Sequence, residues 1–190
     1  DYREDFIASM EENAKLSSCT SKKLVITRNE ATKMLLNNPS FDYIDIDPFG
    51  SPNPFLDAAM KKIRRNGILA ITATDTAPLC GTYPKACFRK YWAIPRRNFL
   101  MHEFGLRILI RKCQLIAAQY EKSLLTILSY SKDHYFRVFF LATEGKTKVD
   151  KTLELHETID GFGPLWTGQL WDKKLIKNML SLAVNEYIHQ

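Results

Sequence analysis

An acid, a proline and an aromatic ring follow one another at Asp47-Pro48-Phe49, directly after the alternating apolar residues of 41–47. The Asp47-Pro48 step supplies a carboxylate and an outward-facing backbone carbonyl, because proline has no N–H to donate. Two such acceptors fit the N–H groups of an exocyclic aromatic amine and can orient its nitrogen for in-line attack. Phe49 would stack on the base that carries this amine. The alternative is a local Asx-type turn with no chemistry.

Strands must hold these residues in place. Residues 41–47 and 68–75 are apolar, β-branched runs, and an amphipathic helix is predicted between them at 54–67. A strand at 23–27 and a helix at 30–37 are predicted before them. Repeated strand and helix segments indicate a parallel sheet in an α/β fold, so Asp47 and Asp75 would lie at the edge where such sheets bind ligands.

The remaining elements complete this sheet. Helices are predicted at 4–16 and 102–120, and an antiparallel pair at 124–131 and 135–143. The expected sheet is therefore mostly parallel with an antiparallel terminal strand. Residues 76–100 are expected to be irregular, and the polar run from 144 to 152 is expected to be a linker. We expect one domain at 1–144, followed at 145–190 by the linker and the start of a second domain.

Composition limits the partners. The chain has 190 residues with 27 basic and 21 acidic side chains, a net charge of +6, which predicts a basic face for a polyanion. Its four cysteines form no C-x-x-C pair, so neither zinc nor a disulfide framework is expected, and a reducing compartment is favoured. No apolar run approaches the length of about 18 residues that a membrane span needs. We therefore predict a soluble protein without a metal.

The segment after the second strand suits a nucleic-acid substrate. It interleaves cations with aromatic rings, a mixture that binds phosphates and stacks bases. The residues expected to contact the substrate are Asp75, Thr76, Lys85, Arg89 and Lys90.

Longer stretches resemble one enzyme family. "DYIDIDPFGSPNPFLDAA", "GILAITATDTAPLCGTYPKACFRKY" and "GPLWTGQLWD" are similar to the tRNA guanine-N2 dimethyltransferases, which use S-adenosylmethionine. The resemblance covers most of the chain and implies a class I (Rossmann-like) methyltransferase sheet. It implies that Asp47, Pro48 and Phe49 are catalytic, with Asp47 also next to the cofactor.

The resemblance also implies cofactor contacts. Asp1 would hold the ribose hydroxyls of S-adenosyl-L-methionine, and Glu30 and Ala31 would line the adenine pocket. Glu30 stands where the family usually has Asp, and Thr32 where it has Asn. All eight glycines lie at or after Gly50, so the family's N-terminal glycine loop is missing and the sheet is expected to be N-terminally incomplete. A preceding segment or a partner chain would supply that loop.

The function implied is methyl transfer to the N2 of a guanine in tRNA, at position 26, with dimethylation. The alternative is a catalytically incomplete tRNA-binding fragment of such an enzyme. Methylation of an amine in DNA is a further alternative that would use the same Asp-Pro-aromatic arrangement, but it does not account for the segment "TATDTAPLCG". The expected location is the cytoplasm of an archaeal-like cell, or the nucleus or mitochondrion of a eukaryotic one.

Overall fold

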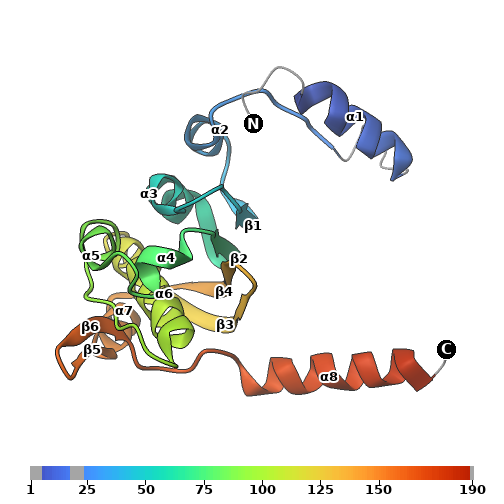
Figure 1. Ribbon diagram of the computed structural model, residues 1–190. Helices are drawn as coiled ribbons and strands as arrows, with labels where there is room; N and C mark the ends of the chain where they lie inside the picture. Colours follow the sequence, from blue (N-terminus) through green and yellow to red (C-terminus); the bar gives the residue numbers. More distant parts are fainter. Residues whose placement is uncertain (1–5, 18–23, 189–190) are drawn as a thin grey trace. The chain divides into compact units, whose positions relative to one another are not determined.

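The computed structural model describes residues 6–17 and 24–188, and the chain divides into two compact units at residues 1–39 and 40–190. The first unit contains helices α1 (Phe6–Leu16) and α2 (Ala31–Asn37) (Figure 1). The strand predicted at 23–27 is wrong for its described part, because residues 24–27 form no strand and Val25 is 84% exposed. A β-branched run becomes a strand only where a partner strand and an apolar face support it.

The second unit is built on a four-stranded mixed sheet (Figure 1). Its strands are β1 (Phe41–Ile46), β2 (Ile63–Ala73), β3 (Lys122–Lys132) and β4 (Tyr135–Glu144), in the spatial order β1-β2-β4-β3. β1 and β2 are parallel, whereas β4 runs antiparallel to both β2 and β3. The α/β fold and the antiparallel terminal pair are confirmed.

The helix between the parallel strands is shorter than the sequence suggests. α3 spans Asn53–Lys62, and Ile63 already pairs with Phe41 in the ladder of β1 and β2. Ile63 is almost fully buried, so the sheet draws the chain into an extended conformation before the expected cap at Asn66-Gly67. Arg64 and Arg65 therefore belong to β2 and not to the last turn of the helix.

The main core lies between the sheet and helix α6 (Met101–Ala118). Phe136, Val138 and Phe140 alternate along β4 and are fully buried. The approach is close at Gly105, where an added Cβ would lie 2.9 Å from the Phe136 ring and 3.1 Å from the Leu79 carbonyl. Only glycine allows the helix to come this near.

Two segments contain more structure than expected. Residues 76–100 include two helices, α4 (Thr76–Leu79) and α5 (Pro84–Tyr91), so the irregular segment predicted there is wrong. Pro84 suits the first turn of α5, and Cys87 and Tyr91 are buried on its inner side.

The polar run after β4 is also a helix, α7 (Lys146–Leu153), so the linker expected there is wrong. Val149 and Thr152 are buried, and Thr152 forms a hydrogen bond with Ser123 of β3 at 2.8 Å. This buried face explains why a polar segment folds. Strands β5 (His156–Ile159) and β6 (Phe162–Trp166) follow as a hairpin, and helix α8 (Lys173–Ile188) ends the described chain. The domain boundary at residue 144 stays a prediction.

The described residues contain neither a helix suited to span a membrane nor a cluster of metal-binding side chains. None of the helices there is both long and apolar enough to cross a membrane. No group of three or more His, Cys, Asp or Glu side chains in residues 6–17 and 24–188 is arranged to hold a metal ion.

Candidate active site at the ends of the parallel strands

Asp47 directly follows β1, and Asp75 lies just beyond the end of β2. Because the two strands are parallel neighbours, both carboxylates lie at the same edge of the sheet. Two backbone contacts join the loops: the Gly50 N–H donates to Thr74 Oγ1 at 2.6 Å, and the Thr74 N–H donates to the Gly50 carbonyl at 3.0 Å. The loops that follow the two strands are therefore joined, with Asp47 and Asp75 at the same edge of the sheet, as the sequence predicts.

The loop after β1 presents an aromatic ring to solvent. Phe49 is 101% exposed, and Asp47 beside it is exposed as well. Gly50 has a φ of +84°, a conformation that favours glycine and turns the chain back toward Thr74. An apolar ring held outward in this way is available to stack on a base.

Hydrogen bonds brace this loop from behind. Tyr91 is buried and donates its hydroxyl hydrogen to Asp75 Oδ1 at 2.6 Å, and its oxygen lies 3.0 Å from Ser51 Oγ. Lys90 Nζ lies 3.1 Å from Asp75 Oδ2. Asn53 Nδ2 donates to the Lys90 carbonyl at 2.8 Å. The loop is therefore connected to the end of α5, and burial raises the pKa of Tyr91 strongly, so the hydroxyl stays protonated.

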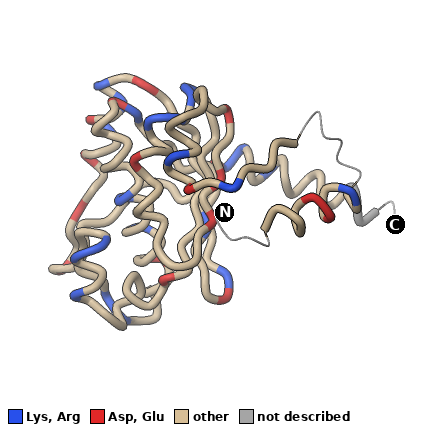
Figure 2. The backbone as a smooth tube through the Cα atoms, turned by 90° about the horizontal axis from the view of Figure 1, so that it is seen from above, with Lys and Arg blue, Asp and Glu red and all other residues tan. Residues whose placement is uncertain are grey.

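The predicted substrate contacts lie on α4 and α5. Lys85 and Arg89 are exposed on α5, whereas Lys90 is partly used by its ion pair with Asp75. Thr76 begins α4 and is half-buried. Basic and acidic residues are interspersed along the described backbone (Figure 2), so we treat the cations of α5 as a local cluster.

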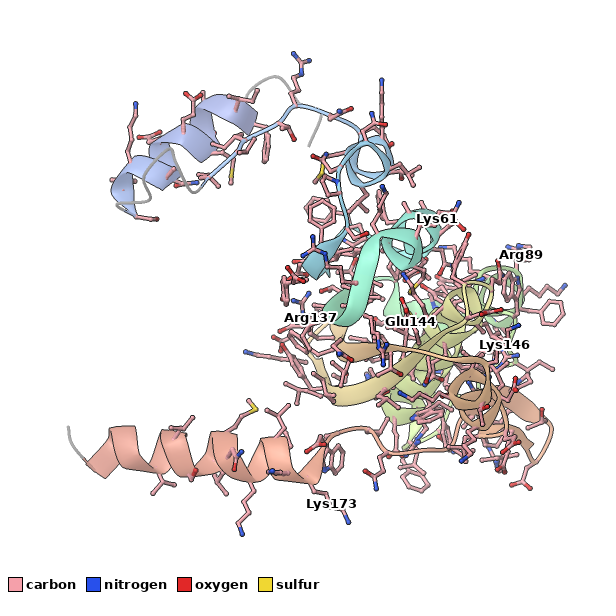
Figure 3. The ribbon with its side chains drawn as sticks, turned by 180° about the vertical axis from the view of Figure 1, so that it is seen from behind. Lys61, Arg89, Arg137, Glu144, Lys146 and Lys173 are labelled. Atoms are coloured by element: carbon pink, nitrogen blue, oxygen red, sulfur yellow. The ribbon has the colours of Figure 1, made fainter. Side chains whose placement is uncertain are left out.

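A pocket of about 360 Å³ opens next to Asp47. Its lining residues come from the strand ends and from the β3–β4 hairpin: Asp47, Thr72, Thr74, Tyr130, Tyr135 and Arg137. Arg137, labelled in Figure 3, makes two hydrogen bonds to the Asp45 carboxylate, at 2.6 and 2.7 Å. The hydrogen bond from Arg137 lowers the pKa of Asp45, and in return the hydrogen bond to Asp45 raises the pKa of Arg137.

The predicted cofactor residues lie apart in the chain. Asp1 is outside the described residues. Glu30 caps α2, where its two carboxylate oxygens accept from the N–H groups of Thr32 and Lys33 at 2.8 Å. These backbone hydrogen bonds lower the pKa of Glu30, so it is ionised at neutral pH. Ala31 is the first residue of the same helix.

The pocket wall and the brace are not among the site residues that the sequence predicts. Tyr130, Tyr135 and Arg137 lie in predicted strands, and Tyr91 is one of several aromatic residues in the predicted substrate segment. A signal for Arg137 was present, since the alternation in "YFRVFF" puts it on the face opposite Phe136 and Val138. A charged residue on a strand at the ligand-binding edge is a candidate for a site.

The fold and the site together define an α/β protein that presents an acidic residue, a proline and an aromatic ring at the end of a parallel strand, as amino methyltransferases do. A family model for N2,N2-dimethylguanosine tRNA methyltransferase matches residues 1–160, and the chain belongs to that family.

Similar proteins agree with this. A tRNA (guanine(26)-N(2))-dimethyltransferase of Pyrococcus furiosus is 40% identical over 96% of this chain and 54% of its own length. A tRNA (guanine(26)-N(2)/guanine(27)-N(2))-dimethyltransferase of Aquifex aeolicus is 40% identical over 88% of this chain and 51% of its own. The structure of Trm1 from Pyrococcus horikoshii with S-adenosyl-L-methionine superposes with a TM-score of 0.87 at 36% identity, covering 95% of this chain and 58% of that one. The chain thus spans about half the length of the curated relatives it matches.

Proposed function

We propose that the protein transfers methyl groups from S-adenosyl-L-methionine to the exocyclic N2 of a guanine in tRNA, at position 26, and does so twice. The family supports this reaction, as do the relatives that carry this activity in their names. The observation that carries the proposal is the placement of Asp47 at the end of β1, in the wall of a pocket and beside the exposed ring of Phe49.

The chain's own residues orient the amine. In the first transfer, the Asp47 carboxylate and the Pro48 carbonyl accept from the two N–H groups of N2, which concentrates the nitrogen lone pair toward the incoming methyl carbon. In the second transfer, one of these acceptors holds the single N–H that remains. Phe49 stacks on the base after it leaves the RNA stack. S-adenosyl-L-methionine, when bound, would supply the methyl group for the new C–N bond, and its sulfur would keep the electron pair of the C–S bond. The nitrogen then releases a proton to Asp47 or to water.

The cofactor supplies an electrophilic methyl group on a sulfonium centre. Glu30 suits its adenosine part, because a carboxylate has about four lone-pair sites and the helix cap uses one site on each oxygen. The remaining sites can accept from an amine or a hydroxyl. Ala31 would leave room for a flat ring beside them, and Asp1 would take the ribose hydroxyls.

The RNA would contact the exposed side of α5. Lys85 and Arg89 offer cations there, and the exposed rings of Tyr83 and Phe88 lie in and beside the same helix. Phosphates would pair with the cations and unpaired bases would stack on the rings. Asp75 and Thr76 would contribute at the strand end nearest to Asp47.

We also infer a cytoplasmic location, which the free thiols of Cys80, Cys87 and Cys113 support.

The test is methyl transfer from labelled S-adenosyl-L-methionine to tRNA, read by nucleoside mass spectrometry as N2-methylguanosine and N2,N2-dimethylguanosine. Asp47→Ala should lower the transfer rate by about a hundredfold or more, because the acceptor that orients the amine is lost. The Kd for tRNA should stay within about twofold, since phosphate contacts dominate RNA affinity.

Two results would count against the proposal. Transfer by Asp47→Ala within about tenfold of the unaltered chain would show that this carboxylate does not orient the amine. Salt-sensitive tRNA binding without cofactor binding or transfer would favour the second reading, a substrate-binding piece that needs another segment for catalysis.

A further inference from the structure

The wall of the pocket opposite Asp47 comes from the β3–β4 hairpin. Three of its side chains, Tyr130, Tyr135 and Arg137, lie within eight positions of one another around the hairpin turn. A pocket of about 360 Å³ is within the usual range for a small-molecule site, and a purine base fits such a space. The mechanism above uses only the Asp47 side of this pocket.

Strand register places these side chains on one face. Arg137 pairs with Thr72 across β4 and β2, and with Tyr130 across β4 and β3. Directly paired residues of antiparallel strands point to the same face of a sheet. Tyr135 is two residues before Arg137 and therefore shares that face. The pocket wall is thus a row across three strands, which ends beside the carboxylate that follows β1.

Arg137 holds this row in position. Its guanidinium donates to both oxygens of Asp45 and to Thr72 Oγ1, the latter at 2.6 Å, and it stacks over the Phe139 ring with its central carbon 4.7 Å from the ring centre. Each terminal nitrogen therefore already donates at least one hydrogen bond within the protein. We regard Arg137 as a positioning residue and assign the base contacts to the tyrosine hydroxyls.

The two tyrosines form a compact pair. Their rings meet edge to face, with centroids 6.1 Å apart and planes at 74°. Tyr130 is 38% exposed and Tyr135 is half-buried, so both rings border the open pocket. Burial, followed by a side-chain hydrogen bond with Tyr135, raises the pKa of Tyr130, so its hydroxyl stays protonated at neutral pH.

We propose that Tyr130 and Tyr135 select guanine by donating hydrogen bonds to the acceptors of its O6 and N7 edge, while Asp47 accepts from the amine. This inference rests on the proposed function and assigns a specificity role to the hairpin. Guanine presents O6 and N7 as acceptors, whereas adenine presents an amine donor in place of O6. The tyrosine hydroxyls would donate to O6 and N7, and the Asp47 carboxylate would accept from the amine, so both the acceptors and the donor group of guanine find partners.

The inference predicts how the enzyme treats 2-aminopurine. This base keeps the 2-amino group and N7 but lacks O6, so it removes one of the two acceptors of the tyrosine hydroxyls and leaves the methyl acceptor in place. A site built to hydrogen-bond a substrate group rejects an analogue that lacks it, because the site's own polar groups are then left unpaired.

The experiment compares transfer to tRNA that carries guanine or 2-aminopurine at the target position. The unaltered chain should prefer guanine by about a hundredfold or more in kcat/KM. The double variant Tyr130→Phe/Tyr135→Phe keeps both rings and should lose about tenfold to a hundredfold on guanine. Its rate on 2-aminopurine should fall less than its rate on guanine, because only the N7 contact is lost there, so the preference shrinks.

Tyr120→Phe is the matched control. It also removes a tyrosine hydroxyl that donates to a carboxylate, that of Asp57, but Tyr120 follows α6 and precedes β3, at the strand edge opposite the pocket. Its preference for guanine should equal that of the unaltered chain. A double variant that keeps the full preference would overturn the inference, and if Asp47→Ala abolishes transfer in the same assay, the proposed function would still stand.

A second measurement decides the matter if the chain alone transfers no methyl group. Guanosine and 2-aminopurine riboside are titrated into the chain, and the ring signals of its tyrosines are followed by NMR, with the two Phe variants used for assignment. Guanosine should shift the Tyr130 and Tyr135 signals at a concentration at least about fivefold lower than 2-aminopurine riboside does. Equal shifts, or shifts at neither tyrosine, would refute the selection of guanine by this wall.

Discussion

Among single residues, Tyr91 links the proposed catalytic loop to the helix expected to contact RNA. Its hydroxyl lies between Asp75 and Ser51, and Asp75 is only 11% exposed. A carboxylate in that position depends on its hydrogen bonds, because water reaches it poorly. Tyr91 touches neither Asp47 nor a reacting atom, so we regard it as a positioning residue.

We predict that Tyr91→Phe lowers the free energy of unfolding by about 1–2 kcal/mol, because the Asp75 carboxylate loses its shortest hydrogen bond. Transfer should fall by about tenfold through kcat, since the Ser51 side of the loop is no longer braced. Urea unfolding and steady-state kinetics measure the two effects. Ser51→Ala keeps the hydrogen bond between Tyr91 and Asp75 but removes the Tyr91 contact and the longer bond from the Asn53 N–H, and it should reduce kcat with a smaller loss of stability. Unchanged kinetics in both variants would contradict the bracing role.

At the scale of single residues, the sequence predicts Asp47 as a candidate site residue but does not predict the residues of the pocket wall. The order Asp47-Pro48-Phe49 carries its chemistry in neighbouring positions, so it can be recognised without the fold. Tyr130 and Arg137 become neighbours only through the pairing of β3 with β4. The register of this pairing shifts between Thr126 and Leu128, and no local sequence pattern predicts the shift.

At the scale of elements, strands with clear alternation were predicted well, whereas those set by tertiary contacts were not. The alternation in 41–47 and 135–143 matches β1 and β4. The start of β2 was predicted as helix, because residues 63–67 are mostly polar and their strand conformation comes from pairing with β1. Residues 24–27 show the reverse case, a β-branched run without a strand.

The β5–β6 hairpin docks on α6 through a neutral histidine. His156 Nε2 lies 2.8 Å from the Gln114 side-chain oxygen, and Gln114 in turn donates to the Leu124 carbonyl. This arrangement makes Nε2 the donor, so the ring can stay uncharged. Burial, assisted by the charge of Arg111, lowers the pKa of His156 from 6.5 to about 4.

The fold should therefore lose stability in mild acid. Because the folded-state pKa lies below the unfolded value, the contribution is fully present above pH 6.5 and is lost as the pH falls toward 4. We expect a loss of about 1–2 kcal/mol, allowing for the partial exposure of the ring. Urea unfolding at pH 7.5 and pH 5 should show a smaller pH dependence for His156→Gln, whereas the same substitution at exposed His134 should leave it unchanged. If the free energy of unfolding changed equally between pH 7.5 and pH 5 in both variants, His156 would be excluded as the cause of the acid sensitivity.

At the scale of the whole molecule, Lys and Arg are mixed with Asp and Glu along the described backbone (Figure 2), although the chain carries a net charge of +6. Net charge alone therefore does not show where RNA would bind. At α5, exposed cations and aromatic rings occur together, and a hydrogen bond joins the helix to the loop that follows Asp47. Lys173 and Lys177 on α8 carry the same charge, and Figure 3 shows Lys173 well apart from Arg89.

These two pairs give a direct test of where the RNA contacts lie. Each phosphate contact made by a Lys or Arg contributes nearly one to the slope of log K against log salt concentration. Lys85→Ala/Arg89→Ala should therefore reduce that slope for tRNA by about 1.5 to 2 and weaken binding at low salt. Lys173→Ala/Lys177→Ala removes the same net charge and should leave the slope unchanged within error. If both pairs reduce the slope equally, the attraction comes from overall charge, and α5 is not the RNA-binding surface.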